Sequence, residues 1–189
     1  MDDAHGFSSG TVIRLLRRIG QGDEHAFVEL FRAINRRVFL FAFHRLGNRE
    51  DAEEVLIDTA EELWRHPERY LGHSRFMTYV LGIANHRASD LLRRQGRRQE
   101  EAVEVTEDVA DPDPTPFEVL IGKQKLACIA RCMERLPQRQ RVIVHLAYFE
   151  DLSREEIGRL LGCTDNAVRQ HLHQALRNLK ALLAGTGLT

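Results

Sequence analysis

Amide and basic side chains recur along one stretch near the end of this 189-residue sequence. Asn, Gln and Arg can each make paired hydrogen bonds with the edge of a base in the major groove of DNA. Their spacing places them on one face of a helix, opposite the apolar residues Val168 and Leu172. This face predicts base reading, although a solvated helix surface without a ligand has the same pattern. The candidate reading residues are Asn166, Arg169, Gln170, His173, Gln174 and Arg177.

A short turn is expected to position that helix. Ser153 and Glu156 form a Ser-x-x-Glu capping box, which marks the start of the preceding helix. Gly162 can end this helix in a left-handed conformation, and Thr164 can cap the next one. The pattern predicts a helix-turn-helix. The apolar stripe expected on its second helix is Val168, Leu172, Ala175, Leu176, Leu179 and Leu183.

The rest of the chain also has helical periodicity, and no sustained alternation of apolar and polar residues marks a strand. The fold class is therefore predicted to be all-α. No run approaches the roughly 18 apolar residues that a membrane-spanning helix needs, and the first ten residues lack the order of a signal peptide. We expect a cytoplasmic protein with no membrane insertion.

No arrangement of residues indicates catalysis. The sequence has no phosphate-cradling glycine loop and no recognisable pair of nucleophile and base. Cys128 and Cys132 lie one helical turn apart, but no second Cys or His pair stands at zinc-finger spacing. We predict a protein that is not an enzyme and that uses no cofactor and no metal.

The formal net charge of −1 conceals a segregation of charge along the chain. Residues 99–118 contain eight acidic and no basic side chains, whereas residues 123–180 contain 11 basic and six acidic ones. Basic charge concentrated in helices is typical of surfaces that bind phosphate. The separate acidic tract indicates a different environment or partner.

This segregation and the apolar pattern predict two small helical domains, residues 10–98 and 117–184, joined by a flexible acidic linker over residues 99–116. The linker contains Asp-Pro-Asp-Pro-Thr-Pro and almost no large apolar side chain. It cannot bury enough surface to offset the entropy lost on ordering. The helix-turn-helix belongs to the second domain.

Two blocks of sequence resemble the extracytoplasmic-function group of bacterial RNA polymerase sigma factors, and together they cover roughly Asp23 to Leu183. The block that resembles region 2 contains Ala26-Phe27, Asp51-Ala52-Glu53-Glu54, Phe76-x-Thr78-Tyr79-Val80 and Asp90-x-Leu92-Arg93-Arg94. The block that resembles region 4 contains Leu136-Pro137-x-x-x-Arg141, Leu152-Ser153-x-Glu155-Glu156-Ile157 and Ala167-Val168-Arg169-Gln170. The departures from the family pattern include Ile57, Ala60, the pair Asn85-His86, and Asn166-Ala167-Val168-Arg169.

The resemblance implies a transcription initiation factor that binds core RNA polymerase and directs it to promoter DNA. Region 4 would read the minus-35 element, and region 2 would hold the opened strand of the minus-10 element. Holding unpaired bases requires a basic track with a stacking face. The loop 66–74, which includes Tyr70, and the helix expected over 75–98 offer such a track, whereas Tyr79 fits the apolar stripe and is expected in the core. The candidates are Arg69, Arg75, Asn85, His86, Arg87, Arg93 and Arg94.

The helix expected to start near Asn48 and to end at Pro67 has an acidic face. A solvated surface explains such a face equally well, but the resemblance implies that it binds the polymerase clamp. The candidate polymerase-binding residues are Glu53, Glu54, Ile57, Asp58 and Glu61. The resemblance also implies an anti-sigma protein as a further partner.

Three alternatives remain open at the level of the sequence. A helix-turn-helix regulator that acts without polymerase would explain the second domain but not the first. A helical scaffold that binds only proteins would explain the acidic faces but not the basic helices. The acidic linker can serve as a plain tether, or it can pass through the basic RNA channel of polymerase as the resemblance implies.

Overall fold

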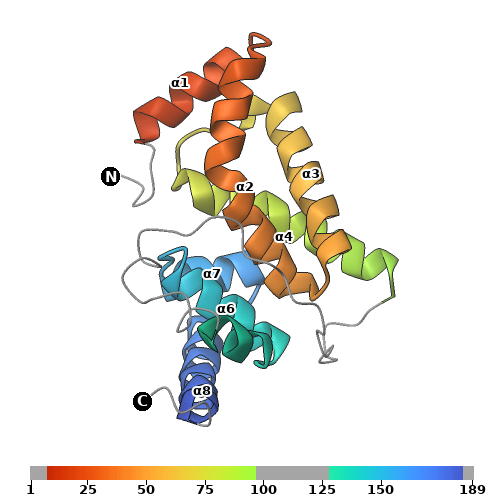
Figure 1. Cartoon of the computed structure of the whole chain (residues 1–189). Coiled ribbons are helices and arrows are strands. Elements are labelled where there is room, and N and C mark those ends of the chain that lie inside the picture. The colour runs from red at the N-terminus through yellow and green to blue at the C-terminus, as the bar shows by residue number, and fades with distance from the viewer. Residues whose placement is uncertain (1–7, 97–127, 185–189) are drawn as a thin grey trace. The chain divides into compact units, whose positions relative to one another are not determined.

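The computed structural model describes residues 8–96 and 128–184, and within these ranges it contains helices and no sheet (Figure 1). The all-α prediction is confirmed. Residues 128–134 are also helical. The named helices are α1 (Ser9–Ile19), α2 (Glu24–Leu46), α3 (Arg49–Arg65), the 3₁₀ helix η1 (Pro67–Arg69), α4 (Phe76–Arg94), α6 (Gln138–Tyr148), α7 (Arg154–Leu161) and α8 (Asp165–Ala184).

The described residues fall into two compact units. Unit 1 contains residues 8–43 and 50–96, and unit 2 contains residues 128–184 together with the short segment 44–49. Two units agree with the expected two-domain organisation, but the exact domain limits stay a prediction. The predicted linker 99–116 and the start of the second predicted domain lie outside the described residues.

Local polar signals set the helix boundaries of unit 1. The backbone N–H of Ala26 donates to Oδ1 of Asp23 at 3.1 Å, so the Asp23 carboxylate caps the start of α2. Gly47 has φ of 83°, a left-handed conformation that lets the chain reverse after α2. Helices α2 and α3 then run antiparallel (Figure 1), and the ring edge of Trp64 packs on Phe27 with centroids 5.2 Å apart.

The core of unit 1 joins all four of its α-helices. On α1, the buried residues are Val12, Leu15, Leu16 and Ile19, which recur at helical spacing. The largest fully buried side chains contributed by the longer helices include Leu30, Val38, Phe41, Leu63 and Leu81. Burial of each large aliphatic or aromatic side chain stabilises the fold by about 1.5 to 3 kcal/mol before entropy is counted.

Helix α4 is shorter than the sequence predicted. It ends at Arg94, and Gly96 adopts φ of 65° directly afterwards. The expected extension to Arg98 is therefore wrong, because a left-handed residue breaks the helical path. Arg97 and Arg98 lie outside the described residues.

The helix-turn-helix of unit 2 forms as predicted. Ser153 accepts from the N–H of Glu156 at 3.2 Å, and the Glu156 carboxylate accepts from the N–H of Ser153 at 2.8 Å. Gly162 ends α7 with φ of 66°. The N–H of Ala167 donates to Oγ1 of Thr164 at 3.2 Å, which caps α8.

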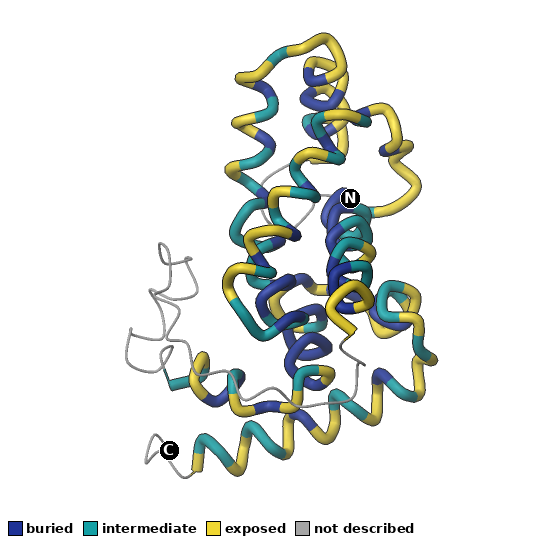
Figure 2. Tube along the Cα trace, turned by 90° about the vertical axis from the view of Figure 1, so that its right-hand side faces the viewer, coloured by how far each residue is buried: buried dark blue, intermediate teal, exposed yellow. Residues whose placement is uncertain are grey.

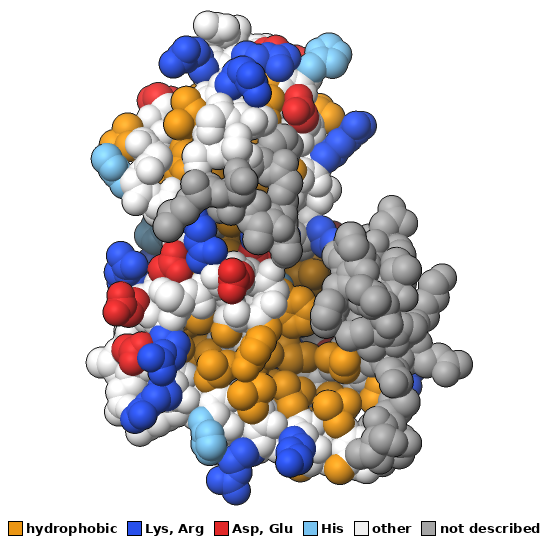
Figure 3. Space-filling model, turned by 90° about the vertical axis from the view of Figure 1, so that its left-hand side faces the viewer, with side chains coloured by type: hydrophobic (Ala, Val, Ile, Leu, Met, Phe, Trp, Pro, Cys, Tyr) orange, Lys and Arg blue, Asp and Glu red, His pale blue; other side chains and the backbone are white. Residues whose placement is uncertain are grey.

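The core of unit 2 is a cluster of Met133, Leu136, Val144 and Ala175, with Ile129, Leu172, Leu179 and Leu182 packed against it. Figure 2 shows exposed positions alternating with intermediate and a few buried ones along α8. Leu176, expected in the stripe, is instead 41% exposed, because the stripe is wider than the elements that cover it. Figure 3 shows apolar side chains gathered on one face of this unit.

Among the described residues, none of the helices combines the length and the apolar character needed to span a membrane.

Candidate nucleic-acid interface

The outer face of α8 presents all six predicted base readers to solvent. Asn166, Arg169, Gln170, His173, Gln174 and Arg177 are each exposed. Val168 and Ala175, on the opposite face, are fully buried and hold the helix against the rest of unit 2. Five of the six candidates, together with Asn178, line one shallow surface hollow. The structure therefore brings these donors and acceptors together along one exposed side of the helix.

Backbone contacts in the turn fix the angle at which α8 leaves α7. The N–H of Cys163 donates to the carbonyl of Gly158 at 2.9 Å. A Cβ atom on Gly158 would lie only 2.7 Å from the carbonyl oxygen of Cys163, so this close approach requires glycine. Nε of Arg154 also lies 3.3 Å from the Asp165 carboxylate, which links the first turns of the two helices.

Two side chains on α8 have roles that the sequence analysis missed or left open. Asn178 was missed: its amide donates to Oε1 of Gln140 at 2.9 Å and ties the middle of α8 to α6. The guanidinium of Arg169 donates to Oδ1 of Asn166 at 2.9 Å. Asn166 therefore orients the Arg169 side chain as well as offering its own amide. The sequence offered only one indication of this contact, which is that Asn178 is a polar residue next to the apolar stripe of α8.

In unit 1, the exposed end of α4 combines basic groups with one acid. His86 and Arg93 are largely exposed, and both lie beside Asp90. Nε2 of His86 is 3.4 Å from the Asp90 carboxylate, and Arg93 forms an ion pair with it. The hydrogen bond from Arg93 lowers the pKa of Asp90, so the carboxylate stays ionised. The basic face of α4 is thus partly neutralised at its centre.

The remaining α4 candidates are less accessible. Arg75, at the N-cap of α4, and Asn85 are half-buried. The backbone carbonyl of Asn85 accepts from the Ser89 hydroxyl at 2.8 Å. Arg94 is exposed, with its guanidinium 3.8 Å from the Glu54 carboxylate on α3. The structure therefore distributes these candidates between an open face and a half-covered flank.

Glu62 on α3 binds two of the predicted nucleic-acid-binding arginines. Nη2 of Arg87 donates to Oε2 of Glu62 at 2.7 Å, and Arg69 of η1 forms an ion pair with Oε1. The Glu62 side chain is only 17% exposed. These pairs connect α3, η1 and α4, so Arg69 and Arg87 hold the fold as well as adding positive charge to the surface.

The two tyrosines differ from the sequence-based expectation. Tyr70 was expected to be exposed, but it is buried, and its hydroxyl donates to the carbonyl of Ser74 at 2.8 Å. Its ring packs edge-on against Phe76 at 5.2 Å. Tyr79 was expected in the core, but it is only half-buried, and its ring lies 5.3 Å from that of Tyr70. Burial raises the pKa of Tyr79. Of these two rings, that of Tyr79 is the more accessible to solvent.

The outer face of α3 contains the predicted polymerase-binding residues. Glu53, Glu54 and Glu61 are exposed and Asp58 is half-buried. Ile57 is 66% exposed in the middle of these acids, although an isoleucine normally lies inside a folded protein. Ile57 is therefore the apolar centre of an otherwise acidic face.

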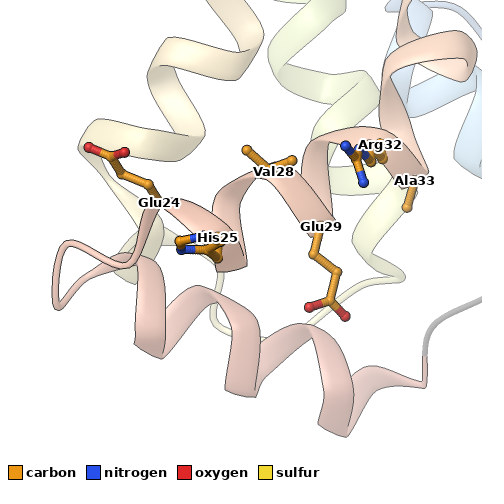
Figure 4. A pocket seen from close by; sticks show the side chains of 6 residues that line it. All are labelled: Glu24, His25, Val28, Glu29, Arg32 and Ala33. Carbon is orange, nitrogen blue, oxygen red and sulfur yellow. The ribbon is translucent and has the colours of Figure 1, made fainter.

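A further hollow lies along α2 and is separate from all predicted site residues (Figure 4). Every side chain that lines it comes from this one helix: Glu24, His25, Val28, Glu29, Arg32 and Ala33. Acidic and basic groups alternate there with apolar ones. The hollow therefore lacks the single sign of charge that a phosphate-binding surface requires.

Comparison with known families gives two matches. The model described as Sigma-70 region 2 matches residues 30–98, and the model described as Sigma-70, region 4 matches residues 126–179. Together they cover more than half of the chain. They occur in the order predicted from the sequence, and the second includes α6, α7 and most of α8.

Curated relatives give the same result. The chain is 31% identical over 157 residues to the ECF RNA polymerase sigma factor SigE of Mycolicibacterium smegmatis, covering 82% of this chain and 61% of that protein. It is 29% identical over 174 residues to SigD of Mycobacterium tuberculosis, covering 88% of this chain and 81% of that one.

Among solved structures, the fold is similar to that of RpoE from Bartonella quintana, solved with the anti-sigma factor NepR. The TM-score is 0.63 at 18% identity, over 84% of this chain and 96% of that one. The fold is also similar to that of CnrH in its complex with the cytosolic domain of CnrY, with a TM-score of 0.59 at 20% identity over 93% and 98% of the chains. On the two family models and the curated relatives, the chain belongs to the extracytoplasmic-function sigma factors of the sigma-70 family.

Proposed function

We propose that this chain binds core RNA polymerase and directs it to promoters, with unit 2 reading the minus-35 element and unit 1 holding the opened minus-10 strand. The observation that carries the proposal is that one chain contains matches to sigma-70 regions 2 and 4 in the family order. Each matched region also presents exposed residues that are suited to DNA.

In this proposal α8 enters the major groove. Its open face offers amide, imidazole and guanidinium groups, which can read base edges, while Arg177 near the middle of the helix can contact a phosphate. Asn166 and Arg169 lie within the first five residues of α8. In helix-turn-helix proteins the N-terminal residues of the recognition helix contact base edges, so this end of α8 is the strongest candidate for sequence discrimination.

Unit 1 would act on the melted strand. Arg93, Arg94 and His86 form the accessible basic end of α4, and the half-exposed ring of Tyr79 offers a surface on which a base can stack. Arg69 and Arg87 add positive charge while remaining bound to Glu62. No covalent step is required, because the bound strand is captured by stacking and by phosphate contacts.

The acidic face of α3 would bind polymerase. Ile57 provides an apolar centre, and the surrounding carboxylates suit a basic partner surface. A protein inhibitor is a second proposed partner, since the RpoE of Bartonella quintana was solved in complex with an anti-sigma factor. Such an inhibitor would compete for surfaces that polymerase or DNA needs.

In vitro transcription tests the proposal directly. Core polymerase is incubated with promoter-containing DNA, with and without the purified chain, and the start sites are mapped. New start sites that depend on the chain are expected. Promoter binding that occurs equally well without polymerase, with no new start sites, would instead favour a helix-turn-helix regulator that acts alone.

A further inference from the structure

Helix α1 presents a basic face that none of the predicted sites uses. Its apolar residues turn inward, while Arg14, Arg17 and Arg18 are exposed on the opposite side. The helix contains no acidic residue. In Figure 3, arginine side chains gather at one end of unit 1, on the side of the molecule where α1 lies in Figure 1.

These three arginines differ in how far they are neutralised. Arg18 forms an ion pair with Asp23 at 2.7 Å. Arg14 donates only to the neutral hydroxyl of Thr11, at 3.4 Å. Arg17 makes no ion pair within the described part of the chain. Figure 4 shows the Glu29 carboxylate pointing toward α1, but it forms no ion pair with these arginines among the described residues.

The basic face also lies next to the loop proposed to hold the melted strand. Helix α1 contacts η1. A Cβ atom on Gly20, at the end of α1, would lie 3.5 Å from Cγ of Pro67, and one on Gly72 would lie 4.0 Å from Cδ1 of Ile13. Helix α1 therefore borders the 67–72 segment at both of its ends. Arg14 and Arg17 extend the positive charge of this segment.

We propose that Arg14 and Arg17 form a phosphodiester-binding site that contacts the promoter DNA backbone beside the melted region. Two residues three apart on a helix are neighbours on its surface, so both guanidiniums can reach phosphates of one strand. Arginine also suits phosphate because its planar fork donates two parallel hydrogen bonds. This inference rests on the proposed function, since it requires that unit 1 meets opened DNA.

The test compares the full-length wild type with the variant R14Q/R17Q, each assembled with core polymerase. Promoter binding is measured as a function of salt on duplex DNA and on a template with a premelted bubble. Each lost phosphate contact reduces the slope of log K against log salt by about 0.7 on single strands and about 0.9 on duplex, so two contacts reduce it by about 1.4 to 1.8. R18Q is the matched control, because Asp23 already neutralises that charge, and it should change the slope little.

The two templates identify the strand that is bound. If the slope falls by the same amount on both templates, the contacted phosphates belong to duplex DNA. If it falls only on the bubble template, they belong to the unpaired strand. Both results support the site. The midpoint of thermal unfolding of R14Q/R17Q should equal that of the wild type, because both side chains are exposed and neither forms an ion pair among the described residues.

Two results would overturn the inference. One is a salt slope unchanged from the wild type on both templates. The other is weaker binding of the variant to core polymerase without DNA, which would make this face a protein contact. Either result leaves the sigma-factor proposal intact as long as the wild type directs new start sites, whereas a wild type that directs none removes the proposed function itself.

Discussion

On α8, the Asn166 side chain orients that of Arg169. The Arg169 guanidinium donates to the Asn166 amide oxygen at 2.9 Å while both side chains stay exposed. This bond uses only one of the five N–H donors of the guanidinium. The other N–H donors remain available for the edge of a guanine. The bond to Asn166 restricts the directions in which the guanidinium can point.

Replacing Arg169 with alanine should weaken binding of the polymerase complex to the upstream promoter element by about 1 to 3 kcal/mol, because a bidentate base contact is lost. Asn166→Ala should have a smaller effect, since it removes the orienting bond and leaves the guanidinium. The measurement is fluorescence anisotropy with labelled promoter DNA. Arg131→Ala, an exposed arginine in the helical segment 128–134, is the control. Equal affinity of Arg169→Ala and wild type would exclude Arg169 as a reader.

Glu62 is the residue on which the geometry of unit 1 depends most directly. Glu62→Ala removes the partner of both Arg69 and Arg87, and should destabilise the fold by about 1 to 3 kcal/mol, the range for hydrogen bonds to charged groups. The control is Glu61→Ala, which removes one exposed pair with Arg65 and should cost no more than about 0.5 kcal/mol. Urea denaturation followed by circular dichroism measures both. Equal stability of the two variants would contradict the structural role of Glu62.

At the scale of the elements, two glycines in helices have opposite structural roles. Gly158 of α7 lies against the backbone of the turn, and an added Cβ would meet the Cys163 carbonyl oxygen at 2.7 Å. Gly82 of α4 has open space around its Cβ position. The structural role of a helical glycine therefore depends on how closely neighbouring backbone approaches it, and its position within the helix does not reveal this.

The two glycines predict opposite changes in stability. Gly158→Ala should destabilise the chain by about 1 to 3 kcal/mol through overpacking against backbone that cannot move freely. Gly82→Ala should stabilise it by about 0.5 to 1 kcal/mol, because alanine loses less conformational entropy in a helix. Differential scanning calorimetry measures both shifts. A Gly158→Ala protein as stable as the wild type would show that the turn relaxes.

The elements also show what the sequence could and could not predict. The capping box at Ser153 and the left-handed Gly162 are local signals, so the limits of α7 were predicted well, whereas the end of α4 before Gly96 was missed. The bonds between Glu62 and Arg87, and between Asn178 and Gln140, join residues 25 and 38 positions apart. Such bonds depend on how helices pack, which periodicity does not specify. Tyr70 was misjudged for a different reason, because its burial follows from the fold of its own loop, in which it contacts Ser74 and Phe76.

For the whole molecule, the surfaces proposed for different partners carry charge of different sign. The outer face of α3 is acidic around Ile57, whereas the outer faces of α1 and α8 contain several arginines. This segregation is invisible in the net charge of −1. It allows one small chain to bind a protein through one face and phosphate through others, with each interaction responding differently to salt.

A substitution at Ile57 tests whether the outer face of α3 binds polymerase. Ile57→Ala should weaken binding to core polymerase by about 1 to 2 kcal/mol, roughly tenfold in affinity, because apolar area that would be buried in the complex is lost. Stability of the free chain should not fall, since the side chain is 66% exposed. Val28→Ala, 44% exposed on α2, is the control. Surface plasmon resonance with immobilised core enzyme measures both, and equal affinities would remove Ile57 from the contact.

The hydrogen bond between the Tyr70 hydroxyl and the Ser74 carbonyl has a consequence for the speed of promoter melting. It links two residues of the same loop, and Pro67 at the start of that loop is buried. The loop is thereby held near one shape before any nucleotide arrives, so its ordering entropy is incurred during folding rather than on binding. Capture of a flipped base should then be limited by how often the duplex breathes, and little by rearrangement of the protein.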